Sequence, residues 1–533
     1  MKYGFIIDNR KCIGCHACTV ACKSEHDVPV GVNRTWVKQV EKGTFPNSRR
    51  LFSVMRCNHC TDAPCVEICP VEALHIREDG IVDFDNSRCI GCKACTQACP
   101  YDALYIDPNT HTAAKCNYCA HRVDVGLEPA CVNVCPEHAI ISGDMEDPTS
   151  EIAQLLASES VSVRKPEKGT RPNLFYIDGD EGSLTPLVAP KTENNLWGSQ
   201  TGGVGHFAKY AGERMGEKDL VQMAKELGGE EAGGQAPKKR IEVIMEQARR
   251  VYDAPHKGTL WGWEVSAYVW TKAISAGTFL VAFLALVANW GPISEAHTWL
   301  ALAVALVFLG LTGALLVKDL DKPMRFAYVL LRPQWRSWLV RGGYAITVFG
   351  GLLTLWGVAK WLNVPLLEQV ALWGGAVFAL LTAVYTAFLF AQAKGRDFWQ
   401  SPVLAFHMLG HSIMAGAAVF ALATLFMEAS ESWMHYLRNV LYISIGANLL
   451  MMLVELTTTH PTIDAKTTVK MIVSGRYSKY FWLGAILLGN LIPLALATLS
   501  GSLPLALAGL CVLLGIYFTE HVWVQAPQQI PLS

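Results

Sequence analysis

Charge of either sign is scarce in this sequence, and neither sign is in excess. Its 533 residues carry 45 lysines and arginines against 46 aspartates and glutamates, a net charge of -1, and only 17% of residues are charged. A nucleic-acid partner needs a strongly basic domain or stripe to neutralise phosphates, and the sequence has none. We therefore expect no nucleic-acid partner.

An export signal is also missing from the first residues. The stretch from Met1 to Arg10 has no apolar core, no small-residue cleavage site and no twin arginine. We expect the cysteines that follow to stay in a reducing compartment, where thiols persist as ligands or nucleophiles rather than as disulfides.

Cysteine is almost absent after residue 135, and before it the cysteines are dense. Sixteen of the 17 lie between Cys12 and Cys135, and the last, Cys511, sits in an apolar stretch. The first group has the spacing C-x2-C-x2-C-x3-C, and the third group repeats it, so the pattern is an internal repeat. The four groups are Cys12, Cys15, Cys18 and Cys22; Cys57, Cys60, Cys65 and Cys69; Cys89, Cys92, Cys95 and Cys99; and Cys116, Cys119, Cys131 and Cys135.

This spacing is typical of bacterial ferredoxins, in which three close cysteines bind one 4Fe-4S cluster and the fourth reaches the neighbouring cluster. Sixteen thiolates predict four such clusters. Gly14 and Gly91, each just before a second ligand, suit the tight turn. Zinc knuckles or cytosolic disulfides are the alternatives, and neither explains the repeated spacing.

The chain divides by composition into three parts. Short strand signals, such as 80–85 and 103–107, predict an α+β duplicated ferredoxin-like iron-sulfur domain over residues 1–185. Gly, Lys and Glu then predict a tether over 186–257 with short helices near 217–227 and 239–252. An apolar remainder, 258–533, follows.

The apolar remainder predicts an all-α bundle of eight transmembrane helices, because a span needs about 20 mostly apolar residues. Tryptophan and tyrosine flank several spans, as residues at a membrane interface do. The predicted spans are 264–290, 297–317, 338–360, 368–393, 403–426, 434–458, 480–499 and 502–519.

Basic residues gather in the loops on one side of this bundle. The loops on the side of the N-terminal domain carry eleven, against Lys360 and Arg438 on the other side. By the positive-inside rule the iron-sulfur domain faces the cytoplasm, in a multi-pass protein of the inner (cytoplasmic) membrane. The eleven are Lys318, Lys322, Arg325, Arg332, Arg336, Lys394, Arg396, Lys466, Lys470, Arg476 and Lys479.

Polar side chains inside spans are candidate functional residues because they are costly there. Glu264, Tyr268 and Lys272 lie four residues apart on one face of the first span and could line a pocket, although interfacial placement explains them equally well. A second group could form a proton path, and its members are preferred as proton carriers over haem ligands, although each is equally explained as a satisfied buried or interfacial polar group. It consists of His407, His411, Glu455 and Asp319.

Both halves resemble known families. The cysteine groups resemble the four-cluster electron-transfer subunit of molybdopterin oxidoreductases such as polysulfide reductase. The apolar half is similar to the polysulfide reductase NrfD family of quinone-reactive membrane subunits, on the motifs at 319–326, 398–402, 489–493 and 526–533. The two parts commonly occur as separate subunits, and here one chain fuses them.

The resemblance implies ligation across groups, with a quinone pocket at the end of the bundle near the clusters. It implies that Cys12, Cys15 and Cys18 bind with Cys135; Cys116, Cys119 and Cys131 with Cys22; Cys57, Cys60 and Cys65 with Cys99; and Cys89, Cys92 and Cys95 with Cys69. The third-group cluster is then nearest the membrane, the first-group cluster nearest a catalytic partner, and polar residues of the first span lie in the pocket.

These features predict an electron-transfer and quinone-reactive subunit of an oxidoreductase complex. Electrons would pass between the quinone pool, menaquinone or ubiquinone, and a molybdopterin-containing cytoplasmic subunit of polysulfide, thiosulfate or sulfite type, where substrate catalysis takes place. Two alternatives remain: a membrane anchor and electron relay without its own quinone site, and a redox-driven ion-translocating subunit.

Overall fold

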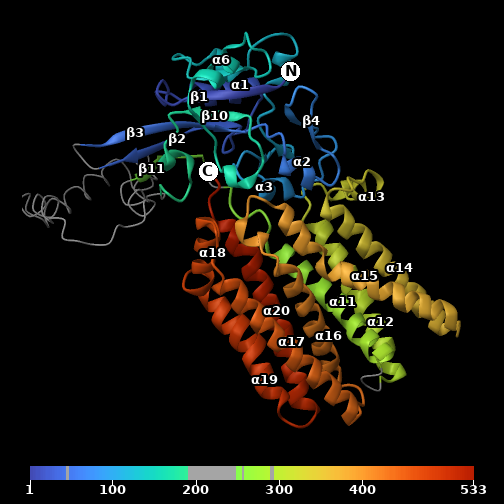
Figure 1. Cartoon of the computed structure of the whole chain (residues 1–533). Coiled ribbons are helices and arrows are strands. Elements are labelled where there is room, and N and C mark those ends of the chain that lie inside the picture. Colours follow the sequence, from blue (N-terminus) through green and yellow to red (C-terminus); the bar gives the residue numbers. More distant parts are fainter. Residues whose placement is uncertain (44–46, 190–247, 255–256, 289–292) are drawn as a thin grey trace, which may run out of the picture.

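The computed structural model describes residues 1–43, 47–189, 248–254, 257–288 and 293–533. A cysteine-rich domain of short strands and helices sits on one end of a bundle of long helices (Figure 1). The predicted fold class, an α+β ferredoxin-like region fused to an all-α eight-helix bundle, is confirmed.

Two sheets form the framework of the cysteine-rich domain. Its strands are β1 (Tyr3–Asp8), β2 (Thr35–Lys42), β3 (Arg49–Arg56), β4 (Leu74–Ile76), β5 (Val82–Phe84), β6 (Tyr105–Ile106), β7 (Ala113–Ala114), β8 (Ile140–Asp144), β9 (Val161–Ser162), β10 (Leu174–Ile177) and β11 (Ala248–Tyr252). The larger sheet has the order β8-β1-β10-β9, with β1 parallel to β10, and the second has the order β11-β2-β3. The pairs β4-β5 and β6-β7 are separate hairpins within the cysteine repeats.

Short helices carry or directly adjoin the later cysteines of each group. They are α1 (Ala17–Glu25), α2 (Pro64–Ile68), α3 (Ala94–Ala98), α4 (Ala120–Val123) and α5 (Ala130–Asn133), and α6 (Glu151–Ser158) and α7 (Glu181–Leu184) follow. Gly14 and Gly91 have φ of +71° and +72°, which favours glycine. A Cβ at Gly91 would also lie 2.7 Å from the Cβ of Asp321 in the bundle. The turn at Gly91 therefore brings its loop against the membrane domain.

The stretch after the last cysteine completes the larger sheet, because β8 and β10 flank β1. The predicted tether differs in its described part. Residues 248–252, expected at the end of a helix, form strand β11 beside β2, with Ala248 and Arg250 buried and Arg249 exposed. That alternation is the period of a strand. The predicted helix at 217–227 lies outside the described residues.

Among the described residues, eight helices are long and apolar enough to cross a membrane, and they match the eight predicted spans. They are α11 (Trp263–Ala288), α12 (Glu295–Lys318), α14 (Trp338–Trp361), α15 (Pro365–Gln392), α16 (Leu404–Ala423), α17 (Glu431–Thr457), the helix Tyr480–Ala497 and α20 (Ser502–Gln525). The helix Tyr480–Ala497 is π-helical to Leu491 and continues as α19 (Ile492–Ala497). Helix α11 is the most buried span and packs against α12, α15, α16 and α20.

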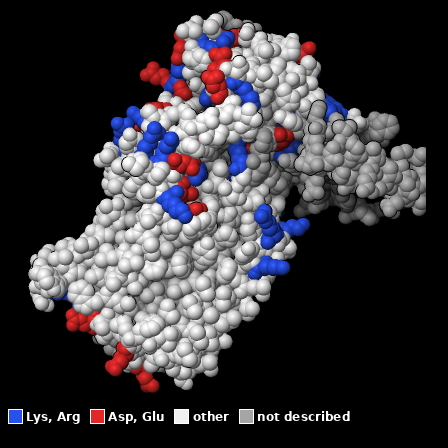
Figure 2. All heavy atoms as spheres, turned by 180° about the vertical axis from the view of Figure 1, so that it is seen from behind, with Lys and Arg blue, Asp and Glu red and all other residues white. Residues whose placement is uncertain are grey.

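The junction between the two domains is held by polar contacts. Arg325 donates to the carbonyl oxygens of Asn86 and Cys89, each at 2.8 Å. Ser337 donates to the carbonyl of Ile68 at 2.7 Å. In Figure 2 the middle of the bundle is nearly bare of charge, Lys and Arg gather toward the junction, and mostly Asp and Glu lie at the far end. The distribution is that of a bundle whose middle lies in lipid.

Candidate functional site

The structure groups the cysteines into four sets, each drawn from two groups of the sequence. One cavity is lined by Cys12, Cys15, Cys18 and Cys135, and another by Cys69, Cys89, Cys92 and Cys95. The other two sets consist of cysteines that lie close enough for the charge of one thiolate to act on the next. We call them set A (Cys12, Cys15, Cys18, Cys135), set B (Cys22, Cys116, Cys119, Cys131), set C (Cys57, Cys60, Cys65, Cys99) and set D (Cys69, Cys89, Cys92, Cys95).

The environment of these sulfurs fits iron-sulfur clusters. All seventeen cysteines are free of disulfides. Backbone amides point at several sulfurs, for example Ala139 N–H to Cys135 at 3.3 Å and Ala113 N–H to Cys89 at 3.4 Å, as they do around cluster thiolates. Burial raises the pKa of the Cys57 thiol to about 11, so iron has to supply the positive charge that keeps it ionised. Among the described residues, no three His, Cys, Asp or Glu side chains are placed so that they could bind a single metal ion.

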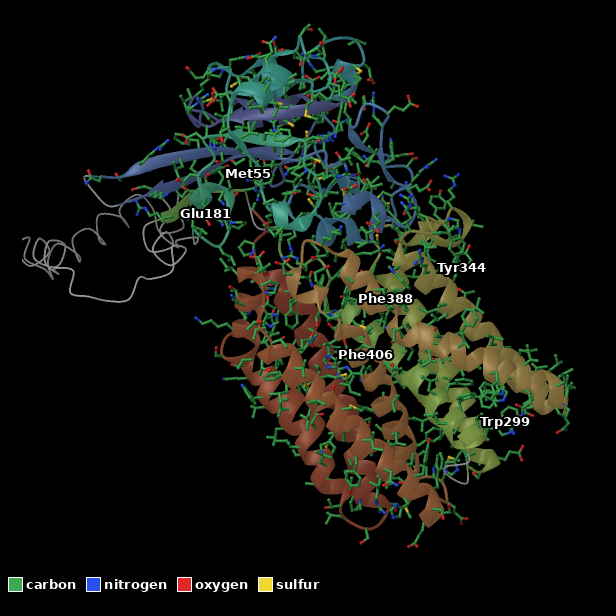
Figure 3. All side chains as sticks on the ribbon, in the orientation of Figure 1. Met55, Glu181, Trp299, Tyr344, Phe388 and Phe406 are labelled. Atoms are coloured by element: carbon green, nitrogen blue, oxygen red, sulfur yellow. The ribbon has the colours of Figure 1, made fainter. Side chains whose placement is uncertain are left out.

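The four sets form a line toward the bundle. Cys18 of set A is an electrostatic neighbour of Cys131 of set B, and Cys116 of set B is one of Cys57 of set C. Set C meets set D through Cys65 and Cys95. Figure 3 shows sulfur atoms distributed through the cysteine-rich domain down to the junction. The order A, B, C, D ends at the membrane domain.

A cavity at the junction touches the last set. Its wall joins the set D loop to α11, α12, α14 and α15, and to the short helix α13 (Tyr328–Leu331). Most lining side chains are apolar, and a few polar groups converge among them, as in small-molecule pockets. The lining residues are Ile90, Cys92, Trp261, Val265, Tyr268, Leu316, Asp319, Leu320, Phe326, Val329, Leu339, Gly343, Tyr385 and Leu389.

The three predicted pocket residues occupy different places. Tyr268 lines the cavity. Lys272 lies behind Tyr385, its Nζ 4.7 Å from the ring centroid, and donates to Thr386 Oγ1 at 2.7 Å. Glu264 does not line the cavity, and its carboxylate faces the Lys318 ammonium at 3.7 Å. Of the three residues predicted to line a pocket, only Tyr268 therefore touches this cavity.

Asp319, predicted for a proton path, lines this same cavity. Its carboxylate lies 3.7 Å from the Nζ of Lys93, which also donates to the Asp319 carbonyl at 2.9 Å. Burial raises the pKa of Asp319 to about 7, Lys93 opposes that shift, and the carboxylates of Glu264 and Asp321 add to it. The Lys93 contact ties the loop beside Cys92 to the cavity wall.

The remaining predicted residues form a second buried polar cluster, which lies between α16, α17 and α20. His407 Nδ1 lies 3.4 Å from Glu455 Oε2, and His411 Nδ1 lies 2.6 Å from Glu520 Oε1. The two imidazole rings are 4.3 Å apart, and Trp523 donates to Glu455 at 3.0 Å. All four titratable side chains are at most 5% exposed.

Two residues of these sites, Glu520 and Tyr385, are not predicted from the sequence. The last span is predicted over 502–519, which leaves Glu520 out, whereas α20 continues to Gln525. Tyr385 stands in an otherwise apolar run, so only its position in space links it to Tyr268. A search for charged residues one turn inside each span end would have found Glu520.

Together these features define a multi-pass membrane protein with a ferredoxin-type iron-sulfur domain at one end. Residues 254–530 match the family model described as polysulphide reductase, NrfD, and this protein belongs to that family. Residues 11–74 and 49–145 match models of the 4Fe-4S dicluster domain. One polypeptide thus joins 4Fe-4S clusters to an NrfD membrane domain.

Curated relatives match about a third of the chain. A tetrathionate reductase subunit of Salmonella typhimurium is 46% identical over 200 residues, which are 37% of this chain and 80% of the relative. A polysulfide reductase component of Wolinella succinogenes is 44% identical over 188 residues, 34% of this chain and 97% of the relative. The arsenate respiratory reductase iron-sulfur subunit ArrB of a Shewanella species is 34% identical over 225 residues, 33% of this chain and 96% of the relative. All three are parts of reductases by name.

Proposed function

We propose that this chain carries electrons between a membrane quinone and a catalytic subunit through four 4Fe-4S clusters bound by sets A to D. The observation that supports this most is the shared wall of the cavity, where Cys92 of set D and the polar residues Tyr268 and Asp319 line one space. A carrier bound there would lie against the last cluster. We also propose the division into 1–185, 186–257 and 258–533 as iron-sulfur domain, tether and membrane domain, with the tether adding strand β11 to the sheet of the iron-sulfur domain.

The residues around the cavity have different roles in the proposed reaction. Quinol oxidation releases two protons and two electrons, and each 4Fe-4S cluster, when bound, supplies a one-electron site. The Asp319 carboxylate accepts a quinol proton, and the Tyr268 hydroxyl forms a hydrogen bond with a quinone oxygen. Trp261 donates to the Cys92 carbonyl at 3.1 Å and holds the set D loop in place. The apolar walls exclude water.

Set A, at the end of the row of cysteine sets far from the membrane, supports a docked catalytic partner, and the basic loops support the side of the membrane on which that partner lies. Cys15 of set A is exposed, and the neighbouring Ile13 is 55% exposed, so set A offers an electron exit toward a docked subunit. We propose a molybdopterin-containing subunit acting on a sulfur compound, by analogy with the tetrathionate and polysulfide reductase relatives. The basic loops at the junction support a cytoplasmic iron-sulfur domain at the inner membrane.

The test is quinol-driven reduction of the purified full chain in lipid nanodiscs. The visible absorbance of the oxidised clusters should fall when a menaquinol or ubiquinol analogue is added. The fall should be as large as the one that dithionite causes, and a quinone-site inhibitor should prevent it. Bleaching by dithionite alone would favour the alternative of an anchor and relay without its own quinone site.

The rate of this reduction should depend on pH through Asp319. Because its pKa is raised to about 7, Asp319 is neutral below that pH and a carboxylate above it. Only the carboxylate accepts a proton from quinol, so the initial rate should rise as pH rises through about 7, and Asp319→Asn should lower it about tenfold and flatten the rise. Stopped-flow rates on both sides of pH 7 check this, and an unchanged pH profile in the variant would refute it.

A second candidate function, redox-driven ion translocation, is supported by the buried cluster of His407, His411, Glu455 and Glu520. Buried, hydrogen-bonded titratable groups within spans are the usual parts of a proton path. Lys272, behind the cavity wall, is an electrostatic neighbour of Glu520, which links the cluster to the cavity.

For this second function, Glu520→Gln should abolish proton movement across sealed vesicles beyond the scalar stoichiometry. Quinol-driven cluster reduction should persist, because Glu520 does not line the cavity. A pH-sensitive dye in proteoliposomes measures the proton movement, and Glu431→Gln, at the exposed start of α17, is the matched control. Equal proton movement in both variants would exclude the path.

A further inference from the structure

Three side-chain nitrogens converge on the sulfurs of set B. His26 Nε2 lies 3.2 Å from Cys119 Sγ, and His59 Nε2 lies 3.7 Å from Cys116 Sγ. Arg56 donates from NH1 to Cys131 Sγ at 3.1 Å. These residues come from three places in the chain: the end of α1, the loop of the second cysteine group and the end of β3.

The geometry fixes each of the three as a donor. His59 Nδ1 accepts from the backbone N–H of Val82 at 3.2 Å, so the ring proton is on Nε2, which faces Cys116. A cysteine thiolate bound to iron has no hydrogen, so His26 must donate to Cys119. Arg56 is always a donor, and its guanidinium is fully buried, 4.5 Å from the Phe5 ring centroid.

The other three sets lack this feature. Among the residues the structure describes, hydrogen bonds from side-chain nitrogen to cysteine sulfur occur only at set B, whereas sets A and D receive backbone amides. Set C has the buried ammonium of Lys115 nearby, but that group donates to the carbonyls of Val82 and Cys116 rather than to sulfur. What distinguishes set B is therefore its side-chain nitrogen donors, one of which is the buried guanidinium of Arg56.

Hydrogen bonds to sulfur and buried positive charge stabilise the more negative, reduced form of a cluster and raise its reduction potential. We propose that His26, His59 and Arg56 are positioning residues that give the set B cluster the highest reduction potential of the four. This rests on the proposed ligation. Electrons that enter at set D would then come to rest at set B, one step before the exposed set A, and wait there for the catalytic partner.

The test is a redox titration of the full chain followed by electron paramagnetic resonance, in the parent and in His26→Leu and His59→Leu. Each histidine variant should lower the reduced-to-oxidised ratio of the highest-potential cluster about tenfold at a fixed potential, which is about 59 mV for one electron. The other three midpoints should not move. His75→Leu, at an exposed histidine in β4, is the control and should shift nothing.

A conservative variant separates a lost hydrogen bond from a packing change. His26→Gln keeps an N–H donor and should restore most of the shift seen in His26→Leu, whereas an equal shift in both would overturn the inference. So would a shift confined to a lower-potential cluster, or no shift with full iron. Iron analysis runs alongside: far fewer than about sixteen irons in the parent would instead contradict the proposed ligation itself.

Discussion

Quinol-driven cluster reduction should fall more than about 100-fold when Gly343 is replaced by phenylalanine, since small displacements of a bound reactant have effects of that size. Gly343 lines the cavity from α14. A Cβ there would lie 3.6 Å from Val329 Cγ1, an ordinary contact, so the backbone tolerates a side chain. A phenyl ring would extend into the space that the quinone needs.

The matched control is Gly351→Phe, on the same helix, where a Cβ meets nothing within 4 Å. Stopped-flow bleaching measures both variants, and dithionite should reduce the clusters fully in each. Equal quinol rates in Gly343→Phe and in the control would show that this cavity is not the quinone site.

Cys92→Ala should abolish quinol-driven reduction of the remaining clusters and leave their reduction by dithionite intact. Cys92 belongs to set D and lines the cavity, so its loss removes the only set that touches the membrane pocket among the described residues. The purified variant should hold about twelve irons in place of about sixteen. Because cluster binding contributes to folding, its iron-sulfur domain should also unfold at a lower temperature.

Cys511→Ala controls for cysteine loss in general. Cys511 lies in α20, outside the four sets, and its replacement should change neither the iron content nor the quinol rate. If Cys92→Ala keeps the full quinol rate, then electrons do not enter through set D.

Much of this architecture could be predicted because the residues that determine it are close in sequence. Cysteine spacing is local, and so is the length of an apolar run, so the cluster domain and all eight spans were predictable. The membership of each set was not derivable from spacing, because each set combines two groups; Cys22, for example, joins Cys116 and Cys131. Resemblance to a family supplied that pairing.

The features that could not be predicted from the sequence depend on contacts between segments that are distant in the chain. Asp319 and Tyr268 meet in one cavity only because α11 and α12 pack together, and no periodicity within either helix indicates this. Similarly, His26 and Cys119 are 93 residues apart, and their contact follows from folding of the repeat. The prediction of a helix at β11 is wrong because a five-residue strand without its partner β2 has little local signal.

The location of the quinone is the most direct test of an electron route that begins in the membrane cavity. A photoreactive quinone analogue, illuminated with the full chain in nanodiscs and followed by peptide mass spectrometry, should label α11 near Tyr268 or α15 near Tyr385, and excess quinone should prevent the labelling. Labelling confined to the opposite end of the bundle, or labelling that excess quinone leaves unchanged, would contradict a quinone site beside set D.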